Sequence, residues 1–311
     1  MLYLCTRFKR VIFLSDMNKR LIIILVLVMG SLAAFSQTNQ CLRVSGKTGM
    51  GFLFYNIPGG VNKPKLSYGG KLDYCYYFNP NWGIGAGLEV SMYNAEGYLD
   101  GLLVSFEGHI DDEGDKFRKD VFFRDWSEIQ KITFVEVPIT FNYQYDFGMK
   151  KRNKMYIYMG VKAQLPLMSS YMVTNGELEI QGYYAEWNVQ LFNLPNHGYG
   201  MEKNKKYTDK LSLPFNVSAI FGIGFSFEVA KMVDVFVGGT FDYGIFNMKS
   251  TGGKDILYED NNRNLQYSGI LNSSAISKAN TVSVQGEVGV RIAVGRKTTR
   301  GGIYRYHNNR Y

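Results

Sequence analysis

Proline, cysteine and histidine are scarce in this chain. Its 311 residues include 7 prolines, 3 cysteines and 3 histidines. So few cysteines exclude a disulfide scaffold, and so few histidines leave little choice of a general base. Glycine, by contrast, occurs 34 times, and aromatic residues make up 15% of the chain. This composition favours a sheet with many turns over a helical bundle.

The sequence also lacks an apolar run long enough to cross a membrane as a helix. The longest, Leu21–Leu32, has about a dozen residues, whereas a helical span needs about 20. It follows a basic stretch at 18–20 and precedes small residues at 34–36, which is the order of a secretory signal. We therefore expect residues 1–36 to be a cleaved signal peptide, with Met17 as a candidate for the true start.

The net charge of +8 is confined to the two ends of the chain. Residues 1–36 and 295–311 carry five basic residues each, which leaves 25 basic against 26 acidic residues between them. A near-neutral body has no basic stripe for a phosphate backbone, so nucleic acid is not an expected partner. We expect 295–311 to be a solvated, basic periplasmic tail; contact with anionic lipid head groups is the alternative.

Eight segments alternate apolar and polar residues with a period of two, as half-exposed strands do. In one of them Val135, Val137 and Ile139 share a face, with Glu136 on the other. The segments are Leu42–Tyr55, Leu66–Phe78, Trp82–Tyr93, Thr133–Asp146, Met155–Leu167, Phe215–Val229, Val233–Phe246 and Thr281–Val294. The exceptions are Ile220, Phe236 and Phe246, which are apolar residues on the polar face.

The connections between these segments alternate between short and long. The short ones are 79–81, 147–154 and 230–232, and the long ones are 56–65, 94–131, 169–212 and 248–280. This asymmetry is typical of outer-membrane barrels. The sequence therefore predicts an all-β protein, in which residues 37–294 form an eight-stranded antiparallel transmembrane up-and-down β-barrel with short periplasmic turns and long extracellular loops, in the bacterial outer membrane.

A soluble lipocalin-like carrier of a small ligand is the alternative, because it also has eight alternating strands. The polar face argues against it, since it is rich in glycine and carries charges of both signs, as a crowded interior needs. The charges are Lys47, Lys71, Asp73, Glu89, Glu136, Lys162, Glu228, Asp242, Glu287 and Arg291. Aromatic residues gather on the apolar face near the turns, as in an interfacial girdle: Tyr74, Tyr76, Phe78, Trp82, Tyr143, Tyr145, Phe225 and Phe227.

One hairpin carries a family resemblance. The segment VEVPITFNYQYDFG at Val135–Gly148, followed by MYIYMGV at 155–161, resembles the PorT-type outer-membrane barrels of Bacteroidetes. The resemblance implies a small barrel without a defined role, and the founding type is associated with a protein secretion system. One departure is that 17 residues follow Val294, whereas many barrels end on an aromatic residue that the assembly machinery recognises. Candidates for that residue are Tyr304, Tyr306 and Tyr311.

The sequence gives little support for a catalytic or a metal-binding site. We place His109, His197 and His307 outside the strands, in solvated segments, so a membrane-facing Ser-His site has no base. An Asp/His site at the loop rim, acting on lipid or peptide, is the alternative. The acidic cluster Asp111, Asp112, Glu113 and Asp115 lacks the glutamate of a calcium loop, where Phe122 stands. We assign no catalytic, cofactor-binding or metal-binding residue and no cofactor.

Function is expected at the surface rather than through a pore, because eight strands enclose a lumen that side chains fill. Three apolar stretches, Leu102–Phe106, Val121–Trp126 and Tyr183–Phe192, fall in the long connections, where we expect them to extend hairpins above the membrane and either to bind a partner or to pack together. The expected partners are outer-membrane lipid and lipopolysaccharide, the barrel assembly machinery, and a secretion-system component or an extracellular ligand. Cys41 and Cys75 lie on the first two strands, and the strand register decides whether they pair.

Overall fold

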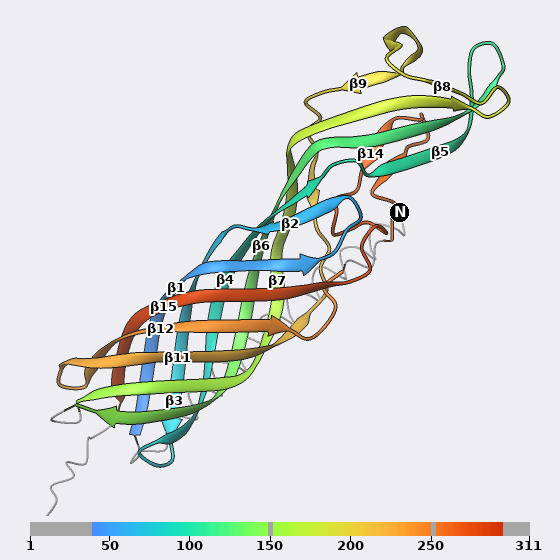
Figure 1. Ribbon diagram of the computed structural model, residues 1–311. Coiled ribbons are helices and arrows are strands. Elements are labelled where there is room, and N and C mark those ends of the chain that lie inside the picture. Colours follow the sequence, from blue (N-terminus) through green and yellow to red (C-terminus); the bar gives the residue numbers. More distant parts are fainter. Residues whose placement is uncertain (1–38, 149–151, 250–252, 295–311) are drawn as a thin grey trace, which may run out of the picture.

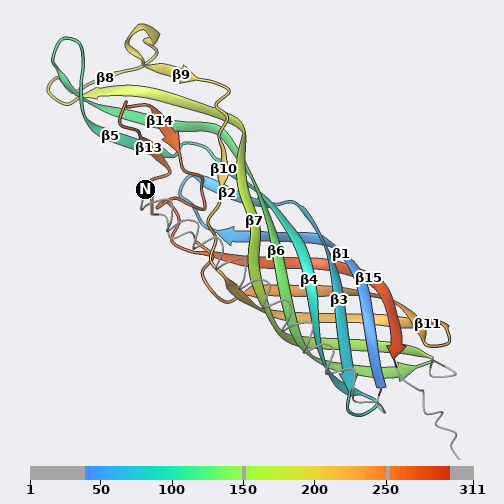
Figure 2. The same ribbon diagram turned by 180° about the vertical axis from the view of Figure 1, so that it is seen from behind.

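Eight strands form a closed antiparallel barrel in the computed structural model, which describes residues 39–148, 152–249 and 253–294. In ring order they are β1 (Asn39–Tyr55), β3 (Leu66–Tyr77), β4 (Trp82–Leu99), β6 (Lys116–Phe147), β7 (Asn153–Tyr184), β11 (Asn216–Ala230), β12 (Val233–Gly244) and β15 (Ala279–Val294). The last strand pairs back with β1, which closes the ring (Figures 1 and 2). The predicted fold is confirmed; the expected signal peptide and basic tail lie outside the described residues.

The two faces of each strand differ as the sequence predicts. Along β4, Ile84 and Val90 are exposed on the outer face, while Glu89 and Ser91 are buried inside. The same holds around the ring, where the apolar residues face outward and the polar residues face inward. An apolar exterior with a polar interior suits lipid outside the barrel and excludes a lipocalin-like carrier, whose interior is apolar.

Short turns close one end of the barrel. Asn79 Oδ1 accepts hydrogen bonds from the backbone N–H groups of Asn81 and Trp82, at 2.9 and 2.7 Å, which fixes the turn between β3 and β4. Beside it, the Trp82 ring lies 5.1 Å from Phe141 and 4.6 Å from Tyr143, measured between ring centroids. Trp82 and Tyr143 belong to the expected aromatic girdle at the periplasmic interface, and Phe141 packs with them.

At the other end, two strands continue far above the barrel. β6 and β7 have 32 residues each, so much of the two longest predicted connections, 94–131 and 169–212, is strand. They pair with β5 (Leu103–Ile110), β8 (Val189–Leu191) and β9 (Gly200–Glu202) to form an extracellular sheet (Figure 1). Two short strands extend this sheet, since β2 (Gly60–Pro64) pairs with β4 and β10 (Thr208–Lys210) pairs with β7. The other short elements are a separate two-stranded sheet of β13 (Leu257–Glu259) and β14 (Leu265–Tyr267), and the 3₁₀ helix η1 (Pro195–His197).

The alternation that marks the membrane segments does not continue into these strands, because the polarity pattern inverts. Within the membrane the apolar residues point outward, whereas above it Trp126, Ile132 and Phe134 of β6 point inward and are buried. An irregularity in the pairing between Arg124 and Ser127 then shifts the alternation. No single apolar face runs through the whole strand, so the alternation of polarity predicts the strand only as far as the membrane surface. Among the described residues, no helix is long and apolar enough to cross a membrane.

Candidate functional site

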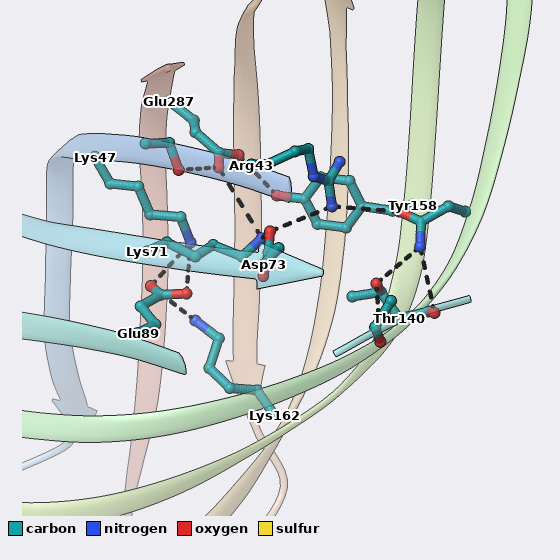
Figure 3. A network of polar contacts seen from close by, with 12 residues as sticks. Arg43, Lys47, Lys71, Asp73, Glu89, Thr140, Tyr158, Lys162 and Glu287 are labelled. Atoms are coloured by element: carbon teal, nitrogen blue, oxygen red, sulfur yellow. Dashed lines mark hydrogen bonds and ion pairs between the residues drawn. The ribbon is translucent and has the colours of Figure 1, made fainter. Parts of the chain in front are cut away.

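The middle of the barrel lumen holds a network of ion pairs centred on Lys162. Its Nζ lies 2.8 Å from Asp242, 3.2 Å from Glu136 and 3.3 Å from Glu89. Lys47 reaches Glu89 from the other side at 2.9 Å (Figure 3). Since these side chains are almost completely buried, each charge depends on its partners rather than on water.

A second group lies beside the first. Asp73 pairs with Lys71 at 2.7 Å and with Arg43 at 3.3 Å (Figure 3). Glu287 accepts hydrogen bonds from Ser45 and Tyr158, at 2.6 and 3.0 Å. The buried ionic residues of the lumen are thus Arg43, Lys47, Lys71, Lys162 and Arg291 with Asp73, Glu89, Glu136, Asp242 and Glu287. The predicted barrel interior with charges of both signs is confirmed, and five basic residues face five acidic ones. Glu228, which was also predicted to lie inside, is only half-buried.

Tyrosine rings fill the lumen nearer the turns. Tyr156 and Tyr158 stack with ring centroids 6.3 Å apart and pack with Ile220 and Phe236, two of the three exceptions to the alternation. The third exception, Phe246, is exposed. Glycines on the neighbouring strands make room: a Cβ at Gly222 would lie 2.2 Å from Cζ of Tyr158. Side chains therefore occupy this barrel as they do other eight-stranded barrels.

The extracellular residues form a packed unit, which we call the head and define as residues 100–132, 168–213 and 253–278. The Trp126 ring lies at its centre, 5.0 Å from Phe123 and 4.9 Å from Tyr267. Leu178 and Ile270 are fully buried against them. Two of the predicted apolar stretches, Leu102–Phe106 and Val121–Trp126, pack into this core.

A buried carboxylate anchors the last extracellular connection to the mouth of the barrel. Glu128 Oε2 accepts hydrogen bonds from Tyr267 Oη at 2.7 Å and from the Ile270 backbone N–H at 3.0 Å. Gln130 donates to Oε1 at 2.7 Å. Burial raises the pKa of Glu128, because the charged form loses its water. The three hydrogen bonds compensate in part, and the two from Tyr267 and Ile270 join β6 to segment 253–278, so Glu128 holds this segment in place.

The sequence predicts His109 in a solvated loop, and the structure shows that this prediction was wrong. It belongs to β5 and is buried, with Nε2 3.1 Å from Glu259 of β13. Lys119 of β6 contacts the other oxygen of Glu259 at 3.0 Å. Burial lowers the pKa of His109 more than Glu259 raises it. The error has a simple cause: β13 lies about 150 residues further along the chain, and only tertiary folding brings it over β5.

The other predicted polar positions stay apart. His197 lies in the exposed helix η1, and His307 lies outside the described residues. Asp111 Oδ1 accepts from the backbone N–H groups of Glu113 and Asp115, and Oδ2 accepts from Tyr184 Oη at 3.0 Å. Its oxygens therefore hold a turn. Within the described ranges, no three His, Cys, Asp or Glu side chains converge as metal ligands do.

The head has a small open pocket beside β10. Its volume is about 190 Å³, and it is lined by Asp209, Ser212, Lys254, Tyr258, Tyr267, Ser268 and Asn272. Pockets for drug-sized ligands measure roughly 300–1,000 Å³. This one therefore suits nothing larger than a single polar ring.

Large apolar side chains are exposed at the far end of the head. We call these residues the apolar tip: Trp187, Val189, Phe192, Leu194 and Met201, which are 39–64% exposed. They do not all share one face of the sheet, since Val189 pairs with the buried Tyr184, whereas Met201 pairs with Glu179 on the other face of β7. The third predicted stretch, Tyr183–Phe192, thus divides: Tyr184 and Leu191 pack against the core, whereas Trp187, Val189 and Phe192 belong to the tip. Leu194 and Met201 were missed, because they lie in an irregular segment without periodicity.

Comparison with protein families agrees with this architecture. The family of the outer membrane protein beta-barrel domain matches residues 35–250. The chain belongs to this family. It is therefore a protein of the bacterial outer membrane, with the apolar band of the barrel in the bilayer and the head outside the cell.

Solved barrels with similar structures share little sequence with it. Neisserial surface protein A is 8% identical, with a TM-score of 0.33, over 81% of this chain and 97% of its own. OprG from Pseudomonas aeruginosa is 9% identical, with a TM-score of 0.38, over 85% and 99%. Ail from Yersinia pestis is 10% identical, with a TM-score of 0.28, over 82% and 100%. Comparison with curated proteins gives no match.

Proposed function

We propose that this protein is a non-enzymatic surface-binding protein: the barrel is its membrane anchor, and the head presents the apolar tip to a partner outside the cell. The observation that carries this proposal is the contrast within the head. A core of large apolar side chains is buried inside the head, whereas five large apolar side chains within residues 187–201 remain exposed near its far end. Exposed apolar patches with a polar surround are typical of interaction sites.

The lumen supports the same proposal. A channel needs an open path, but ion pairs and tyrosine rings occupy the interior, and Glu128 holds the last connection over the mouth. A barrel of this kind serves as an anchor. Lipid and lipopolysaccharide contact its apolar band, and the barrel assembly machinery inserts it.

The test is a binding assay with the head intact and the tip made polar. Protein carrying Trp187→Ser and Phe192→Ser, reconstituted in liposomes, is compared with the wild type for binding to the organism's extracellular fraction and to whole cells. The matched control is Val61→Ser, since Val61 is also exposed but lies in β2, away from the tip. We expect the double variant to lose binding at least tenfold and the control to keep it. Equal binding by all three proteins would refute the proposal.

A secretion accessory of the PorT type is the second candidate. It is favoured by the resemblance of Val135–Gly148, which forms the membrane part of β6. Deleting the gene would then block secretion of other proteins, and the barrel would co-purify with periplasmic machinery. Complementation with the tip variant separates the two roles, because an accessory acting from the periplasmic side restores secretion even with a polar tip.

A further inference from the structure

Two cysteines face each other on neighbouring strands of the barrel. The register of β1 and β3 places Cys41 directly opposite Cys75, two positions from the Arg43 and Asp73 pair. Their relative exposures are 1% and 0%, and both side chains lie inside the barrel, packed with Tyr77. In the structure both are free thiols.

The pairing geometry suits a covalent bond. Opposite residues in an antiparallel ladder have Cα atoms about 4.5 or 5.5 Å apart, and both values lie within the range of about 4.4–6.8 Å that a disulfide accepts. Side chains of an opposed pair also point to the same face of the sheet. The neighbouring strand leaves space, since Gly85 has no side chain and a Cβ there would come 3.3 Å from Sγ of Cys75.

We propose that Cys41 and Cys75 form a disulfide that joins β1 to β3. An outer-membrane protein matures in the periplasm, where disulfides form and persist. Each thiol loses its proton, one Sγ–Sγ bond forms, and two electrons pass to a disulfide oxidant of the cell envelope, which becomes a dithiol. The exchange proceeds through a mixed disulfide, in which a cysteine thiolate attacks the oxidant.

Burial determines when this bond forms. In the closed barrel neither sulfur is accessible, so a protein oxidant cannot reach it. The bond therefore forms on the partly folded chain in the periplasm, after β1 and β3 have paired and before the ring closes. β1 is the strand that closes the ring with β15, so the joined β1–β3 hairpin is present before closure.

Counting thiols tests the bond. Protein from outer membranes is denatured in SDS and treated with a polyethylene-glycol maleimide, with and without prior reduction. Every chain carries Cys5→Ser, which makes the count independent of where the signal is cleaved. We expect no addition without reduction and two additions after it, whereas the matched control Cys75→Ser gives one addition in both samples. Two additions without reduction would overturn the proposal.

A shifted cysteine tests whether the register selects the pair. In the variant Cys41→Ser/Leu42→Cys, the thiol moves to the lipid-facing side of β1, one residue away. We expect both of its thiols to react without reduction. Pairing as complete as in the wild type would refute the role of the register, since chance encounter in the unfolded chain would then suffice.

A host without the periplasmic oxidant tests the order of events. Barrels assembled there are expected to hold two reduced thiols and to resist a protein disulfide oxidant added after folding. Rapid oxidation of the folded barrel would contradict formation before closure. The outcome is independent of the proposed function, because none of these variants alters the head.

Discussion

Lys162 of β7 and Asp242 of β12 meet inside the barrel, with Nζ of the lysine 2.8 Å from Oδ2 of the aspartate. Their strands are not neighbours in the ring, because β11 lies between them. The same ammonium group also contacts Glu136 and Glu89, on β6 and β4. One buried cation thus links four strands across the lumen, and removing it leaves three carboxylates without their shared partner.

Replacing Lys162 by methionine is therefore expected to destabilise the barrel strongly. Breaking a buried ion pair by removing one partner costs about 3–5 kcal/mol. The measurement is the temperature at which the compact band on SDS gels converts to the unfolded band. The matched control is Lys203→Met, since Lys203 is an exposed lysine with one distant carboxylate at 4.0 Å; it should convert at the wild-type temperature. Equal temperatures for both variants would show that the network does not stabilise the barrel.

A side chain at Gly222, opposite Tyr158, is expected to lower the stability of the barrel. A Cβ at Gly222 would lie 2.2 Å from Cζ of the ring, and the ring is held by its hydrogen bond to Glu287 and by Lys71 at 4.7 Å. Gly222→Ala should cost about 1–3 kcal/mol through overpacking, measured by unfolding in urea from lipid vesicles. Gly46→Ala, which meets no atom within 4 Å, is the control. A Gly222→Ala barrel as stable as this control would mean that the ring moves freely.

Removing the carboxylate of Glu128 should loosen the head without opening the barrel. Glu128→Ala leaves the Tyr267 hydroxyl and the Ile270 N–H without their acceptor, and an unsatisfied buried polar group costs about 1–3 kcal/mol. We expect protease added to whole cells to cut within 253–278, while the compact SDS-gel band persists. Glu186→Ala, at an exposed head residue, should resist protease like the wild type. Resistance of Glu128→Ala would show that core packing alone holds the connection.

Acid should loosen the contact between β5 and β13. Burial lowers the pKa of His109 below its usual value near 6.5, although Glu259 opposes the shift and Lys119 and Arg263 add to it. A lowered pKa means that the folded head favours the neutral ring, so this stability is present above the unfolded pKa and is lost as pH falls through the folded one. The protection of the backbone amides of residues 103–110 against hydrogen exchange, corrected for the pH dependence of the chemical exchange rate, should therefore be lower at pH 5 than at pH 7.5.

The variant His109→Gln controls for other titrating groups. It lacks the ionisable ring but keeps a donor for Glu259, so its protection against exchange should depend less on pH than that of the wild type. The same loss of protection in acid in both proteins would assign the effect to another group.

The membrane barrel could be predicted from local pattern because lipid imposes one rule on every strand. Each crossing segment must present apolar residues outward, as Val135, Val137 and Ile139 do, and strand pairing must satisfy the backbone. Eight such segments with alternating short and long connections therefore predict the ring, its orientation and its polar interior. They also predict the charges of the lumen, but not which residues pair, since Lys162 meets Asp242 only across a closed ring.

The sequence by itself determined the barrel, the side of each strand that faces lipid, and the periplasmic position of the turns. Only the tertiary structure determined the arrangement of the head. Above the membrane the surroundings differ from one residue to the next, and the polarity pattern of β6 inverts because its apolar side chains there are buried in the core of the head. Distant segments complete that core, as when Tyr267 packs on Trp126 and Glu259 covers His109. Strand register, which opposes Cys41 to Cys75, likewise depends on the pairing of whole strands rather than on any local signal.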